Sequence, residues 1–173
     1  MKFKNIHKKL IFLLILVFTV SIGYSFFYQI NPVVDAAVYD DIGWNLAQGL
    51  GYVMDDANAG VPSADEAIFR PGPGYQFFLA GTYSIFGHSV SVVWILHGLL
   101  RVISALFIYK IATLLFKDNT NRDTIGLVAA GLFGFSPDLI LINGMLLTET
   151  LFIALTILSV YYTLKIFPDM QLR

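Results

Sequence analysis

The chain has 173 residues, of which 57% are hydrophobic and 13% are charged, and its formal net charge is −1. A soluble domain carries about 25% charged residues, so this composition indicates a membrane protein. The chain has no cysteine, which excludes disulfides, thiolate nucleophiles and cysteine-ligated metals. It also has no basic patch interleaved with aromatic residues, so nothing in the sequence indicates nucleic-acid binding.

Residues 10–28 (LIFLLILVFTVSIGYSFFY) form the first predicted membrane span. They carry no charge and come close to the ~20 residues that a spanning helix needs. A cleaved signal peptide also has basic residues before an apolar core, but that core is normally ~7–15 residues long. Here the core is longer and ends in aromatic residues, which are typical of the membrane interface, so we expect a retained span.

Three further spans are expected, at 89–116, 125–143 and 147–167. Before them, Gly87 ends residues 75–87, which we expect to form a short helix at the interface or against the bundle. Pro137 should break or kink the third span, because proline lacks the N–H donor that a helix interior uses. The sequence therefore predicts an all-α polytopic membrane protein with about four transmembrane helices.

Basic residues set the expected orientation, because cytoplasmic loops are enriched in lysine and arginine. They precede the first span and follow the second and fourth, at Lys2, Lys4, Lys8, Lys9, Lys117, Arg122, Lys165 and Arg173. The loop 31–88 is then extracytoplasmic and carries short interfacial helices. We expect an integral, multi-pass protein of a bacterial or archaeal plasma membrane, with a cytoplasmic N-terminus.

A short amphipathic helix is expected to begin at Asp35, because Val38, Ile42 and Leu46 follow at helical spacing. Asp35 occupies the position of a helix N-cap, and Tyr39 shares its face. Two interpretations stay open for Asp35. Either it only caps the helix, or it acts as a general base or metal ligand at the edge of the bilayer.

The other acids of the loop have simpler interpretations. Asp40 and Asp41 are expected on a solvated face. The remaining four belong to a segment rich in small and polar residues that we interpret as mobile and able to act as a lid: Asp55, Asp56, Asp65 and Glu66.

Arg70 opens a rigid turn, RPGPGY, in which two prolines restrict φ and two glycines permit close approach of the backbone. Its guanidinium could hold a phosphate through two hydrogen bonds. The alternative is an interfacial arginine whose aliphatic stem packs on apolar surface while its charge stays in water.

Charged residues within or beside the spans are further candidates. Arg101 lies near the middle of the second span and shares a face with His97 and Ser104. A charge at that depth is costly and normally faces the bundle interior, where it could pair with an acid, a lipid phosphate or another helix. Glu149 begins the fourth span on the same side as Asp35, either as an acid favoured by the helix dipole or as part of a polar site.

The order of motifs resembles a known family. Asp-x-x-x-Tyr follows the first span, and NLAQGLGY, RPGPGYQFFLAGTYSIFG and SPDLILINGMLLTETLF come after it. Over residues 8–167 this resembles membrane glycosyltransferases of the C superfamily, most closely the protein O-mannosyltransferase and aminoarabinose-transferase branch. The resemblance implies transfer of a sugar from a polyprenyl-phosphate carrier to a lipid, glycan or protein acceptor on the outer face.

The resemblance also implies roles for matching positions. Asp35 matches the acid taken as the catalytic base, and Glu149 matches an acid near the catalytic pocket. Arg70 and Tyr75 match the residues of the turn suited to the donor phosphate. The expected supporting residues are Tyr39, Arg101 and His97.

The sequence departs from the family pattern at several points. Ala36 follows Asp35 where many members have Glu, Gly72 separates two prolines that are often adjacent, and the chain is shorter than family enzymes. We therefore expect the N-terminal portion of such an enzyme, with a non-catalytic membrane scaffold or an inactive fragment as the alternative. Asp35 and Glu149 could bind a divalent metal, although neither their spacing nor their number requires one.

Overall fold

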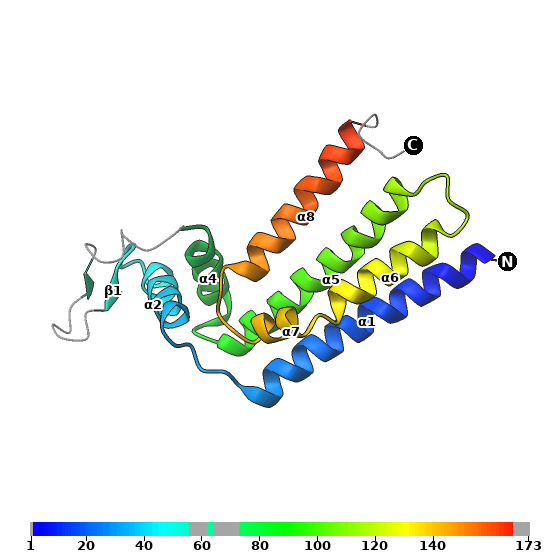
Figure 1. The fold of residues 1–173 in the computed structure, drawn as a ribbon. Coiled ribbons are helices and arrows are strands. Elements are labelled where there is room, and N and C mark those ends of the chain that lie inside the picture. The colour runs from blue at the N-terminus through cyan, green and yellow to red at the C-terminus, as the bar shows by residue number, and fades with distance from the viewer. Residues whose placement is uncertain (1, 56–61, 64–72, 168–173) are drawn as a thin grey trace.

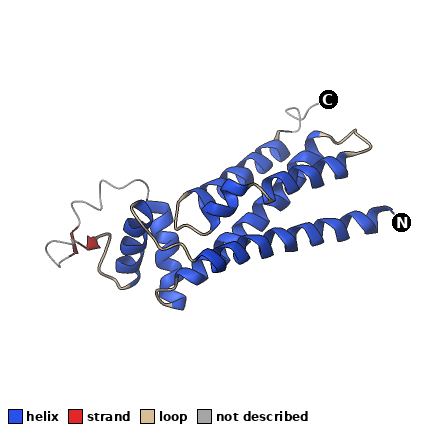
Figure 2. Cartoon of the chain, turned by 60° about the horizontal axis from the view of Figure 1, so that its bottom comes forward, coloured by secondary structure: helices blue, strands red, loops and turns tan. Residues whose placement is uncertain are grey.

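The computed structural model describes residues 2–55, 62–63 and 73–167, and nearly all of its elements are helices (Figure 1). The helices are α1 (Lys2–Tyr28), α2 (Asp35–Ala47), α4 (Pro73–Phe86), α5 (Val90–Leu115), α6 (Arg122–Gly134), α7 (Pro137–Asn143) and α8 (Glu149–Ile166). Two short antiparallel strands, which the sequence did not indicate, follow α2: β1 (Met54–Asp55) and β2 (Pro62–Ser63) (Figure 2).

The long apolar helices form a bundle in which α5 packs against α1, α6 and α8. Among the residues that the structure describes, three helices are long and apolar enough to cross a membrane: Ile6–Tyr28, Val90–Leu115 and Glu149–Ile166. The pair α6 and α7 adds a fourth span if it is counted as one bent element, with an angle of 55° between its parts. This confirms the predicted all-α membrane fold with about four spans.

The break between α6 and α7 lies where Pro137 predicted it. Phe135 and Ser136 interrupt the helix, and Pro137 is the first residue of α7, a position that proline tolerates because the N–H it lacks would be unpaired there anyway. Just before the break, α6 lies very close to α1. A Cβ atom added at Gly134 would clash with the Val17 side chain, so this contact requires glycine.

Helices α2 and α4 pack on each other at the end of the bundle where α1 ends and α5 and α8 begin (Figure 1). The predicted short helix over 75–87 is therefore confirmed, and Gly87, with φ 74°, makes the turn from α4 into α5. A core of buried residues joins α2 and α4 to the bundle: Ala36, Tyr39, Tyr75, Leu79, Tyr83, Val93, Trp94 and Leu146.

Charge divides between the two ends of the bundle. The start of α1, the connection from α5 to α6 and the end of α8 lie at one end, and Lys117, Arg122 and Lys165 lie there with them. Asp35 and Glu149 lie at the other end, with α2 and α4. This is the distribution on which the predicted orientation depends.

Candidate active site

Asp35 begins α2, and its side chain is exposed at the end of the bundle. The prediction that Asp35 caps this helix is wrong. Val34 occupies the N-cap position, with φ 53°, and makes no capping hydrogen bond through its side chain, so Asp35 is the first helical residue. A carboxylate in the first turn of a helix is favoured by the helix dipole.

Glu149 begins α8 at the same end and is also exposed. The Thr148 hydroxyl donates a hydrogen bond to Glu149 Oε2 at 3.3 Å. The segment that leads to Glu149 is well anchored, because Leu146 is fully buried and Leu147 packs against the same core. The two carboxylates predicted to be catalytic therefore each begin a helix at one end of the molecule.

Tyr75 lies inside the core, and its hydroxyl is 3.1 Å from His97 Nε2. On the other side of the ring, His97 Nδ1 lies 3.2 Å from the Asn143 carbonyl oxygen. Because a carbonyl only accepts, Nδ1 carries the proton, and Nε2 of the neutral ring then accepts from the Tyr75 hydroxyl. Tyr39 packs edge-on against Tyr75, with ring centroids 5.8 Å apart.

The surroundings of Tyr75 keep its hydroxyl protonated. Burial raises the pKa of Tyr75 well above its ordinary value, and the negative charges of Asp40 and Glu149 raise it further. Tyr75 therefore donates to His97 over the whole physiological pH range. Of the residues predicted to form the site, the structure brings Tyr39, Tyr75 and His97 into direct contact.

Arg70 lies outside the described residues, as do Asp56, Asp65 and Glu66. The expected phosphate contact of Arg70 and the expected lid therefore stay predictions. The nearest described element is α4, which begins three residues after Arg70 in the sequence.

Arg101 is buried in the bundle, as its position on the face of His97 and Ser104 predicted. Its Nη2 donates to the Gly134 carbonyl oxygen at 2.7 Å, at the C-terminus of α6. Nε and Nη1 have no hydrogen-bond partner in the described part of the chain, and no carboxylate there lies within salt-bridge distance. The sequence allowed Arg101 to pair with an acid, a lipid phosphate or another helix. The structure shows it bonded to another helix, through the backbone of α6.

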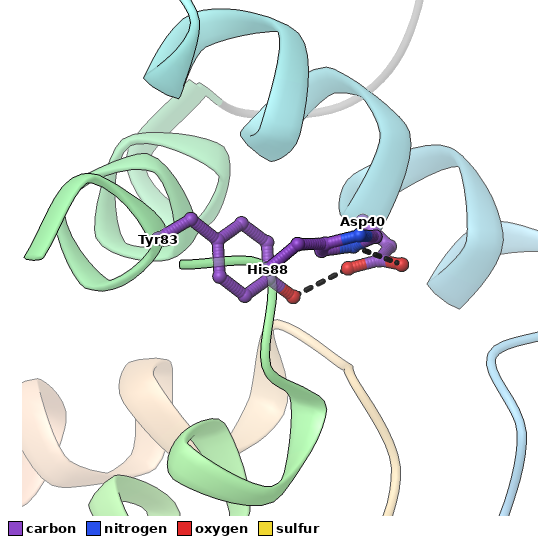
Figure 3. Close-up of polar contacts among 3 residues, drawn as sticks. All are labelled: Asp40, Tyr83 and His88. Carbon is purple, nitrogen blue, oxygen red and sulfur yellow. Dashed lines mark hydrogen bonds and ion pairs between the residues drawn. The ribbon is translucent and has the colours of Figure 1, made fainter. Parts of the chain in front are cut away.

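The interpretation of Asp40 as part of a solvated face is wrong. Its carboxylate is only 16% exposed and accepts a hydrogen bond from the Tyr83 hydroxyl (Figure 3). His88 Nε2 lies 3.0 Å from the other carboxylate oxygen, and the imidazole stacks on Trp44 at 4.9 Å between ring centroids. Burial and the bond to Asp40 both raise the pKa of Tyr83 above its ordinary value.

One signal in the sequence could have placed Asp40 correctly. Gly43 lies three residues after it on α2, and a Cβ atom at Gly43 would come 2.6 Å from Leu79 Cβ. A glycine within a helix can mark the close approach of another element, and residues three apart share a face. Asp40 therefore faces α4 and the turn that follows it.

No site for a metal is evident in the residues that the structure describes. These residues contain no group of three or more His, Asp or Glu side chains placed to hold one ion. The pair of Asp40 and His88 supplies two ligands.

A surface hollow of about 560 Å³ lies at the opposite end of the bundle, far from the predicted site. Lys9, Lys117 and Arg122 are among the residues that line it.

Comparison with known protein families gave a match. The family model described as dolichyl-phosphate-mannose-protein mannosyltransferase matches residues 70–173, which is more than half of the chain. No curated protein and no solved structure matches the chain significantly. The matched segment includes Arg70, Tyr75, His97, Arg101 and Glu149, whereas Asp35 and Tyr39 precede it. The chain belongs to the dolichyl-phosphate-mannose-protein mannosyltransferase family, and its apolar helices are those of an integral membrane glycosyltransferase.

Proposed function

We propose that this chain carries active-site residues of a glycosyltransferase that moves a sugar from a polyprenyl-phosphate donor to an acceptor on the extracytoplasmic face. The family match is the observation that carries the proposal. The arrangement of charge supports its direction, because Asp35 and Glu149 are exposed at the end of the bundle opposite the basic residues.

Asp35 is the proposed base. It would take the proton of an acceptor hydroxyl as that oxygen attacks the anomeric carbon of the donor sugar. The bond from this carbon to the phosphate oxygen breaks, polyprenyl phosphate leaves with the bonding electrons, and the configuration at the anomeric carbon inverts. Glu149, at the start of α8, is proposed to orient the acceptor or the sugar beside Asp35.

Arg70 is proposed to stabilise the negative charge that builds up on the leaving phosphate. Tyr75 follows Arg70 by five residues and is proposed to serve the same phosphate site. Because its hydroxyl donates to His97, it would do so by anchoring the first turn of α4 beside that site. Tyr39 packs against Tyr75 and links this anchor to α2, which carries Asp35.

The proposal is tested by sugar transfer from a radiolabelled polyprenyl-phosphate sugar in membranes that contain the full-length protein. Asp35→Asn should lower transfer by a factor of roughly 100 or more, the loss of a positioned acid–base group. Glu149→Gln should lower transfer by a factor of up to about 100, because the acceptor or the sugar would be misplaced. Asp118→Asn is the matched control, because Asp118 is exposed in the connection between α5 and α6 at the opposite end. Full transfer by Asp35→Asn would overturn the assigned base, and transfer from a nucleotide sugar alone would overturn the donor class.

A further inference from the structure

The break between α6 and α7 leaves a backbone carbonyl that a continuous helix would use. In an unbroken helix the Gly134 carbonyl would accept the N–H group of residue 138. Here it accepts Arg101 Nη2 at 2.7 Å, and the Phe133 carbonyl accepts the Ser136 N–H. The guanidinium also lies at the negative end of the α6 dipole, which favours a cation.

The other end of α7 is held from the same helix, α5. Asn143 is the last residue of α7, and its carbonyl accepts the Nδ1–H group of His97 at 3.2 Å. The Asn143 amide reaches α1, where it donates to Ser25 Oγ at 3.0 Å. These bonds are all buried, where a lost partner costs more than at the surface.

His97 and Arg101 are four residues apart and therefore share one face of α5. Arg101 bonds to the carbonyl of the last residue of α6, and His97 bonds to the carbonyl of the last residue of α7. Five residues separate Asn143 from Glu149, and within them Leu146 is fully buried in the core that holds Tyr75. A displacement of α7 would therefore move the segment that leads into α8.

We propose that Arg101 is a positioning residue. By bonding to the broken end of α6, and together with His97, it fixes α7 and the segment 143–149, and so sets the place of the Glu149 carboxylate at the outer end of the bundle. The consequence for catalysis rests on the function proposed above, whereas the effect on the position of α7 does not.

The position of α7 can be measured without an activity assay, because the chain has no cysteine of its own. A Cβ atom at Gly144 would lie 3.5 Å from Ser25 Oγ, so the pair Ser25→Cys and Gly144→Cys should form a disulfide on oxidation in membranes. Arg101→Met should lower the yield of this disulfide several-fold, because it removes the bond to Gly134. Arg101→Lys should keep it, because an ammonium group can still donate to that carbonyl.

A second pair of cysteines reports on the rest of the bundle. A Cβ atom at Gly98 would lie 3.1 Å from Ile22 Cγ1, so Ile22→Cys and Gly98→Cys should link α1 to α5 in every background. Undiminished linkage of residues 25 and 144 in Arg101→Met would overturn the proposal. Loss of both linkages would overturn it as well, because Arg101 would then hold the whole bundle and not α7.

The catalytic consequence has its own measurement in the full-length enzyme. Arg101→Met should lower kcat roughly 10- to 100-fold, the cost of a misplaced catalytic group, with little change in KM for the polyprenyl-phosphate sugar. Arg101→Lys should restore most of the rate. A change in KM alone would place Arg101 on the donor and contradict the positioning role. If the wild type transfers no sugar, the proposed function fails while the disulfide result still stands.

Discussion

The Tyr83 hydroxyl donates a hydrogen bond to the Asp40 carboxylate, although the two residues are 43 positions apart. Asp40 lies in the middle of α2 and Tyr83 near the end of α4, so this bond ties together the two helices that lie across the end of the bundle. His88, in the turn after α4, bonds to the same carboxylate. The carboxylate thereby fixes both the helix and the turn into α5.

Removing the Tyr83 hydroxyl should loosen this end of the molecule. Tyr83→Phe leaves one oxygen of the Asp40 carboxylate without its donor, which costs about 1–2 kcal/mol of stability. The midpoint of thermal unfolding in detergent should fall by roughly 2–4 °C per kcal/mol. Tyr162→Phe is the control, because Tyr162 is 51% exposed on α8. Equal midpoints for the two variants would contradict the role of the bond.

Alkaline pH should weaken the same contact. The pKa of Tyr83 is higher in the folded protein than in the unfolded chain, so the folded state keeps the proton after the unfolded state has lost it. The contribution to stability is complete below about pH 10 and is lost as the pH rises above it. The measurement covers about pH 9 to 11, which brackets the ordinary pKa of tyrosine. Over this range the unfolding midpoint of the wild type should fall more steeply with pH than that of Tyr83→Phe. Parallel curves would show that Tyr83 does not titrate differently on folding.

Gly43 sets the distance between α2 and α4. A methyl group there would come 2.6 Å from Leu79 Cβ, so Gly43→Ala should push the helices apart and cost about 1–3 kcal/mol. Gly81→Ala is a matched change within α4 at a position with open space around it, and there alanine should be neutral or slightly stabilising. Unfolding midpoints of the two variants in detergent distinguish these outcomes. A Gly43→Ala protein as stable as the wild type would show that the contact can relax.

The helices of this protein were predictable because each depends on local information. Long apolar runs bounded by charge gave the spans, and two breakers were interpreted correctly: Gly87 turns α4 into α5, and Pro137 breaks the third span. The prediction placed the N-cap of α2 at Asp35, whereas the N-cap is Val34, one residue earlier. The sequence could not show this, because Val34 adopts a positive φ that few residues favour and that no sequence pattern marks.

The polar contacts were less predictable, because they join residues far apart in the chain. Local pattern placed Asp40 on a solvated face, whereas its partners Tyr83 and His88 come from the next helix and turn. The burial of Arg101 followed from its depth in the span. Its partner did not, since a backbone carbonyl freed by a proline break carries no side-chain signature.

The orientation of the bundle makes a prediction that single cysteines can test, because the chain has none. Val33 is exposed just before α2, and Thr120 is exposed in the connection between α5 and α6 at the opposite end. In intact cells a membrane-impermeant maleimide should label Val33→Cys, whereas Thr120→Cys should react only after the membrane is permeabilised. The physical reason is the excess of Lys and Arg at the end that holds Thr120, which keeps that end in the cytoplasm. The unsubstituted chain controls for background labelling. The reverse pattern would place Asp35 and Glu149 in the cytoplasm and remove the basis for an extracytoplasmic acceptor.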